Sequence, residues 1–211
     1  MRAVTTVPDR PGAVHVQDVP TPVAAPGQVR VRVHAAGLNR ADLLQVAGRY
    51  PAPPGVPIDR PGLEFAGTLL DDAPRNGLAR GARVLGLVPG AAQGEVVCTD
   101  PRTLLAVPDG MTWPEAGGFA EAALTAFDAL GRRAPIAAGD VVLVHAIASG
   151  VGLAAAQYAR AVGARVLGTT RTAAKAAHIE AMGLATVLVT HDRLQTRAEA
   201  DRNLRKRHHP R

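Results

Sequence analysis

The stretch VVLVHAIASGVGLAAAQ (Val141–Gln157) decides how this chain of 211 residues folds. β-forming residues lead into a turn of small residues, and the turn opens onto an alanine-rich helix. A turn that binds a dinucleotide needs small residues where backbone N–H groups approach the pyrophosphate, and a helix N-terminus directed at that charge. Ser149 stands where a glycine is expected. The stretch is therefore either a nucleotide site with one substitution or an ordinary strand–turn–helix.

Strands and helices alternate along the chain around this turn. The pattern predicts strands at 141–146, 165–169 and 186–190, and helices at 150–162 and 173–182. Gly163 and Gly183 follow the two helices, at the place where a C-capping glycine is expected. This βαβαβ order predicts a parallel sheet, which is half of a doubly wound fold.

The first 110 or so residues differ in composition, because short valine-rich runs lie between prolines and glycines. Alternating polarity predicts strands at 28–38, 82–88, 94–99 and 103–108. Their spacing is typical of a small barrel or sandwich. A short helix is expected within 39–50, and Thr112 with Glu115 three residues later predicts the start of another.

Composition and charge exclude several classes of protein. No apolar run is long enough to span a membrane, and the N-terminus lacks the apolar region of a secretory signal, so we expect a cytoplasmic protein. Cys98 is the single cysteine, which excludes an intramolecular disulfide. Of the net charge of +6, residues 191–211 contribute +4, from seven basic and three acidic residues. A nearly neutral body argues against a nucleic-acid partner, although a weaker alternative is a nucleic-acid binder that uses this tail.

The end of the second predicted strand bears on the choice of cofactor. A site for NAD usually has an acidic residue about 20 positions after the turn, where it holds the ribose 2′-hydroxyl. The segment GTTRTAAK (Gly168–Lys175) contains no acid. Thr170, Arg171 and Lys175 would instead suit the 2′-phosphate of NADPH. The alternative is that Arg171 and Lys175 are solvated charges at the start of a helix.

Four motifs occur in an order that points to a known family. They are AAGLNRADLLQVAGRYPAPPG (35–55), PGLEFAGTL (61–69), EAALTAFDAL (121–130) and AGDVVLVHAIASGVGLAAAQYARAVGARVLGTTRTAAK (138–175). Together they resemble the zinc-independent quinone oxidoreductases, the zeta-crystallin-like branch of the medium-chain dehydrogenase/reductase superfamily. The similarity is strongest to the tumour-suppressor-inducible group, in which serine also precedes Gly-Val-Gly. Ser149 therefore resembles a variant of this branch.

The resemblance implies an α/β protein with a β-rich domain: a GroES-like barrel followed by the first half of a Rossmann doubly wound parallel sheet. The expected divisions are a GroES-like catalytic domain at 1–120, a partial NADPH-binding domain at 121–190, and a basic, disordered tail at 191–211. The implied activity is NADPH-dependent reduction of a quinone or a related enone. Full-length relatives are homo-oligomers, and no membrane or nucleic-acid partner is expected.

The resemblance also implies the residues of the site. Asn39 and Tyr50 match polar active-site positions on the barrel, and Thr125 matches a position near the nicotinamide. Tyr50 has an equally weighted alternative role, as a loop aromatic packed against prolines. The implied cofactor-binding residues are Ala146, Ser149, Gly150, Val151, Gly152, Thr170, Arg171 and Lys175.

Zinc-dependent members of the superfamily place a cysteine and a His-Glu pair on the barrel. Here Asn39 occupies the cysteine-like position, and Leu63 replaces the histidine and leaves Glu64. Glu121 lies where a further cysteine ligand is possible. Without thiolate or imidazole no tetrahedral N/S site can form, so no metal is expected, and the two glutamates are expected to be structural or exposed.

The resemblance ends near Thr190, where relatives continue the doubly wound sheet. We therefore expect a truncated form, with negligible activity in the 211-residue chain itself. Two functions stay open. One is an NADPH-dependent quinone oxidoreductase, and the other is an inactive remnant or nucleotide-binding module without catalysis.

Overall fold

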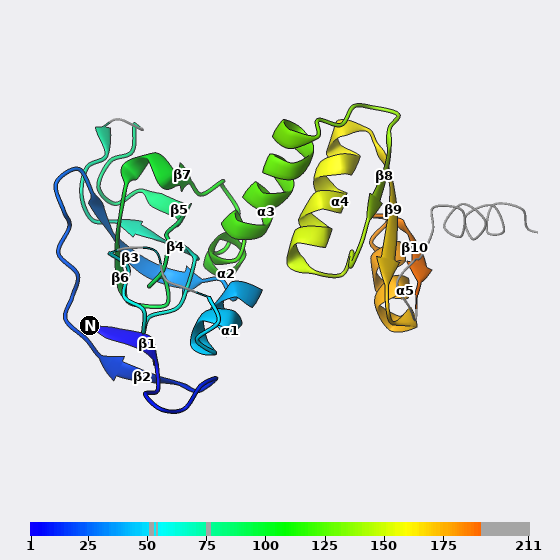
Figure 1. Ribbon diagram of the computed structural model, residues 1–211. Coiled ribbons are helices and arrows are strands. Elements are labelled where there is room, and N and C mark those ends of the chain that lie inside the picture. Colours follow the sequence, from blue (N-terminus) through cyan, green and yellow to red (C-terminus); the bar gives the residue numbers. More distant parts are fainter. Residues whose placement is uncertain (51–52, 54, 75–76, 191–211) are drawn as a thin grey trace, which may run out of the picture. The chain divides into compact units, whose positions relative to one another are not determined.

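The computed structural model describes residues 1–50, 53, 55–74 and 77–190. Contacts between residues divide the chain into two compact units, Met1–Glu121 and Ala122–Arg211. Each unit has its own sheet and hydrophobic core, coloured blue to green and green to orange in Figure 1. The predicted tail at 191–211 lies outside the described residues.

The first unit is built around a five-stranded antiparallel sheet with the order β6-β3-β4-β5-β7. A two-stranded sheet of β1 and β2 joins it through a bridge between Ala3 and Gly94. The strands are β1 (Arg2–Thr6), β2 (Val14–Asp18), β3 (Val29–Ala36), β4 (Glu64–Leu69), β5 (Arg83–Leu87), β6 (Val96–Thr99) and β7 (Leu104–Ala106). The expected β-rich GroES-like domain is confirmed.

The alternation in β3 explains the core of this unit. Val29 and Val31 point inward and are buried, whereas Arg30 and Arg32 are exposed. Phe65 on β4 is fully buried in the same core. A 3-10 turn at Pro101–Thr103 leads into β7.

Two short helices, α1 (Arg40–Val46) and α2 (Trp113–Gly117), complete the first unit. The predicted cap of α2 is confirmed, since the backbone N–H of Thr112 donates to Glu115 Oε2 at 2.8 Å and Thr112 Oγ1 accepts from the backbone of Glu115 at 3.5 Å. Helix α3 (Ala120–Phe127) follows and continues as a π-helical turn at Asp128–Arg133.

The second unit contains a parallel sheet with the order β10-β9-β8. Its elements are β8 (Val141–Val144), α4 (Gly150–Val162), β9 (Arg165–Thr170), α5 (Ala173–Ala181) and β10 (Thr186–Val189). The predicted first half of a Rossmann sheet is therefore confirmed, and α4 has the predicted bounds. Gly163 and Gly183 follow the two helices with φ of 90° and 66°, a backbone conformation that glycine adopts without strain.

The core of the second unit lies between its sheet and helices. Ile147, Ile179 and Val187 are each at most 1% exposed and pack together with alanines of α4. Strand β8 is an edge strand in the described part of the chain, and it leaves Val141 51% and Leu143 41% exposed. No helix among the described residues is both long and apolar enough to cross a membrane.

Candidate functional site

The predicted phosphate turn joins β8 to α4. Ser149 is the N-cap of α4, and its Oγ accepts a hydrogen bond from the backbone N–H of Gly152 at 3.1 Å. Its backbone carbonyl accepts the first helical bond from Leu153, at 2.8 Å. Ser149 therefore caps the helix as serines commonly do. Its hydroxyl proton is not used by that bond and is available to an acceptor.

The two glycines of the turn have different structural roles. A Cβ at Gly152 would lie 2.7 Å from the carbonyl oxygens of both Ala146 and Ile147, so the fold itself requires glycine there. A Cβ at Gly150 would meet nothing closer than the Ala122 side chain, at 3.8 Å. Because N–H groups in the first turn have no acceptor within the helix, the amides of Gly150 and Val151 can face a ligand. Open space beside such amides is what an anion site needs.

The three residues predicted to hold a 2′-phosphate differ in their exposure to solvent. Thr170 is 7% exposed at the end of β9, and its carbonyl accepts from the backbone of Thr190 at 2.8 Å. Arg171 and Lys175 are exposed, just before and within α5. His145, which follows β8, pairs through Nδ1 with Thr169 Oγ1 at 3.1 Å. The exposed groups at this strand end are thus cationic.

The first unit contains a buried polar cluster around Glu64, which is 2% exposed. Glu64 Oε1 accepts from Asn39 Nδ2 at 2.7 Å, and Oε2 accepts from the backbone N–H of Glu121 at 2.9 Å. Asp42 lies beside it and accepts from the backbone N–H groups of Asn39, at 2.7 Å, and Gly62, at 3.1 Å. The cluster links α1, β4 and the first turn of α3, so Glu64 is structural, as one of the two alternatives had it.

Burial changes the acid–base behaviour of two carboxyl groups in this cluster. Burial raises the pKa of Asp42, although the N–H donors of Asn39 and Gly62 oppose it. Burial also raises the pKa of Glu121, and the neighbouring charges of Glu64 and Asp42 add to the effect. The sequence pattern did not signal that Asp42 is buried, because an acid in the first turn of a helix is normally solvated.

The other two predicted catalytic residues are not among the hydrogen-bonded groups of this cluster. Tyr50 follows α1 and is 39% exposed. Thr125 is exposed on α3 and belongs to the second unit. Among the described residues, no group of three or more His, Cys, Asp or Glu side chains could hold a metal ion.

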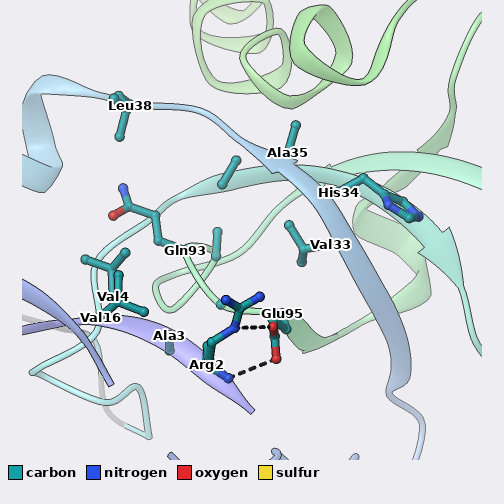
Figure 2. A pocket seen from close by; sticks show the side chains of 13 residues that line it. Arg2, Ala3, Val4, Val16, Val33, His34, Ala35, Leu38, Gln93 and Glu95 are labelled. Atoms are coloured by element: carbon teal, nitrogen blue, oxygen red, sulfur yellow. Dashed lines mark hydrogen bonds and ion pairs between the residues drawn. The ribbon is translucent and has the colours of Figure 1, made fainter. Parts of the chain in front are cut away.

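A shallow hollow of about 390 Å³ opens on the first unit. Figure 2 shows mostly small apolar side chains along it, with the ion pair of Arg2 and Glu95 at its border. Its lining includes Leu38 but neither Asn39 nor Tyr50. The hollow is therefore not the site predicted from sequence.

Comparison with known proteins identifies the family of the chain. Residues 25–132 match the alcohol dehydrogenase GroES-like domain family. The chain belongs to this family. Its match to the spectinabilin polyketide synthase protein NorB of Streptomyces orinoci is 41% identical and covers 71% of the chain, but only 7% of NorB.

Solved structures of oxidoreductases match almost the whole chain. A probable oxidoreductase from Mycobacterium abscessus superposes with a TM-score of 0.83 at 30% identity, covering 98% of this chain and 65% of that protein. The quinone oxidoreductase of Thermus thermophilus, which was also solved with NADPH, gives a TM-score of 0.76 at 36% identity, covering 95% and 63%. This chain thus spans a little under two thirds of these proteins.

The contrast between the two turn glycines gives a stability prediction. Replacing Gly152 with alanine pushes Cβ into two backbone carbonyls, and we expect a loss of roughly 1–3 kcal/mol in the free energy of unfolding. Gly150→Ala is the matched control, because its Cβ has room, and its stability should be unchanged or slightly raised. Urea denaturation of both variants measures the difference. Equal losses would contradict the close packing at Gly152.

The raised pKa of Glu121 gives a prediction about pH. The folded protein holds this proton above the ordinary pKa of 4.5, so stability is present below that value and is lost as pH rises through the folded pKa. Glu121→Gln should therefore melt at a higher temperature than the unsubstituted protein at pH 7 and at the same temperature at pH 4.

Glu115→Gln is the control for this comparison. Hydrogen bonds from Thr112 lower the pKa of Glu115, so its stabilising effect is present above the ordinary pKa and is lost as pH falls. This variant should melt slightly lower than the unsubstituted protein at pH 7. A Glu121→Gln variant that melts lower at pH 7 would show that the carboxylate is not penalised by burial.

Proposed function

We propose that the chain provides the substrate-side barrel and the cofactor turn of an NADPH-dependent oxidoreductase that reduces a quinone or a related conjugated enone. The single observation behind the proposal is the turn at 146–152. Gly150 lacks a side chain where the fold has room for one, beside first-turn amides without helical acceptors. A bound anion explains that glycine, whereas packing does not.

The described residues fit NADPH. Gly150 and Val151 would hold the pyrophosphate through their amides, and Ser149 would add a hydroxyl donor. Ala146 and Gly152 shape the turn beneath it, with Ala146 at a φ of 51°. The exposed Arg171 and Lys175 would hold the 2′-phosphate, and Thr170 would contribute mainly through its place at the strand end. When bound, the nicotinamide supplies the hydride.

The substrate class follows from the donors on the barrel. Quinones and enones both place a C=C bond in conjugation with a carbonyl, so a hydride added at carbon leaves negative charge on the carbonyl oxygen. Asn39 would donate its remaining N–H to that oxygen, and Tyr50 its hydroxyl. Thr125 would contact the nicotinamide. The similarity to a quinone oxidoreductase supports the first substrate, and that to a polyketide synthase supports the enone.

The proposed reaction needs no catalytic metal. Asn39 and Leu63 supply neither thiolate nor imidazole, and the amide nitrogen of Asn39 is turned toward Glu64. The zinc-independent, zeta-crystallin-like branch is therefore the proposed subgroup. We further propose a cytoplasmic protein with a small-molecule substrate and without nucleic-acid or membrane partners.

A second candidate is an inactive remnant or nucleotide-binding module. Such a module would bind the cofactor through the same turn and the same strand-end cations. The two candidates share cofactor binding and differ in turnover. Oxidation of NADPH with benzoquinone or an α,β-unsaturated thioester separates them.

Cofactor preference can be tested directly. Titration of NADPH and NADH against protein fluorescence should show tighter binding of NADPH. The double variant Arg171→Ala, Lys175→Ala should weaken NADPH by about tenfold, which corresponds to about 1.4 kcal/mol, and leave NADH unchanged. Arg165→Ala, at the opposite end of β9, is the control and should change neither. Equal affinity for both cofactors, unaffected by the double variant, would remove the 2′-phosphate assignment.

A further inference from the structure

We infer that Glu64 is a positioning residue for Asn39, because its buried carboxylate fixes which end of the Asn39 amide faces a ligand. The inference rests on the proposed function, in which Asn39 contacts the substrate. Glu64 itself is only 2% exposed. It acts through the side chain that it holds.

The hydrogen bonds of Glu64 determine the direction of the amide. A carboxylate only accepts hydrogen bonds, so the Asn39 atom 2.7 Å from Oε1 must be the nitrogen and not the oxygen. The other carboxylate oxygen, Oε2, accepts from the backbone of Glu121 at 2.9 Å, which prevents Glu64 from turning. Asn39 is left with one N–H for the substrate oxygen.

Steric and backbone contacts hold this pair from two further sides. A Cβ at Gly37 would lie 2.1 Å from Glu64 Oε1, so the carboxylate occupies the space where residue 37 would otherwise have a side chain. Asp42 accepts from the backbone N–H of Asn39 at 2.7 Å, which fixes the main chain of Asn39 at the start of α1. Both ends of Asn39 are therefore anchored, one by each carboxylate.

Replacement of Glu64 by glutamine changes this arrangement in a defined way. The backbone N–H of Glu121 cannot be reversed, so Oε1 of a glutamine must turn toward it and the glutamine NH₂ must face Asn39. Two NH₂ groups cannot face each other, and the Asn39 amide would rotate to accept with Oδ1. Glu64→Gln therefore reverses the Asn39 amide and moves the N–H that would donate to the substrate oxygen away from its place in the unsubstituted protein.

The first measurement uses the side-chain amide signals of Asn39 in ¹H–¹⁵N spectra of the full chain, assigned as the pair lost in Asn39→Ala. In the unsubstituted protein one of the two protons should be shifted downfield by the carboxylate. Glu64→Gln should abolish that shift and keep both signals. Gly37→Ala, which displaces the carboxylate sterically, should also abolish it. Asp109→Asn removes the same charge from an exposed acid and should leave the pair unchanged.

The second measurement is turnover of NADPH with benzoquinone. Glu64→Gln should lower kcat by roughly tenfold or more, because the contacting group is misplaced, while the KM for NADPH stays unchanged. A KM that changes with an unaltered kcat would overturn the positioning role.

The two measurements separate the inference from the proposed function. Absent turnover in the unsubstituted chain would favour the module without catalysis, and the amide spectra would still decide the role of Glu64. An Asn39 pair at the shifts of solvated asparagine in the unsubstituted chain would overturn the inference without any variant. Amide signals of Asn39 that are the same in Glu64→Gln as in the unsubstituted protein would also overturn the inference.

Discussion

The buried carboxylate of Glu64 fixes several elements of the first unit against one another. Removing an ionised carboxyl from water costs several kcal/mol unless donors compensate it. Asn39 and the backbone of Glu121 are those donors, and Gly37 leaves the space that the carboxylate fills. These contacts therefore fix one arrangement of four segments: the end of β3, the start of α1, β4 and the first turn of α3. A change at any of these segments would expose the charge of Glu64 to solvent or leave it without its hydrogen-bond donors.

In the second unit, close contacts with the backbone and side chains explain why some positions hold small residues and others do not need them. Gly152 is required by two carbonyl oxygens and Ser149 caps a helix, so both are explained by the fold alone. Gly168 is explained by Ile147, whose Cδ1 would lie 2.5 Å from an added Cβ. Gly150 has no such reason. A glycine-rich turn therefore supports a cofactor site only through those glycines that packing does not require.

Much of the fold could be predicted because its pattern is local. Helix α4 has the expected bounds of 150–162, since its cap, periodicity and terminal glycine all lie within one short stretch. Strand β4 was not predicted, because Glu64–Leu69 is buried on both faces and shows no alternation. Strand β2 was also missed, because its Val-His-Val alternation is short; all five of its residues are exposed. The contact between Asn39 and Glu64 spans 25 positions and depends on the pairing of β3 with β4, which no local pattern encodes.

Ser149 can now be weighed against the glycine expected at its position. As an N-cap, serine is better than glycine by only a few tenths of a kcal/mol, so helix stability alone hardly distinguishes them. Serine uses the Gly152 amide for its own cap at 3.1 Å, which leaves an anion two amides in place of three. Its hydroxyl proton supplies another donor at the turn. The substitution therefore exchanges one backbone donor for one side-chain donor, and the number of donors available to a phosphate is conserved.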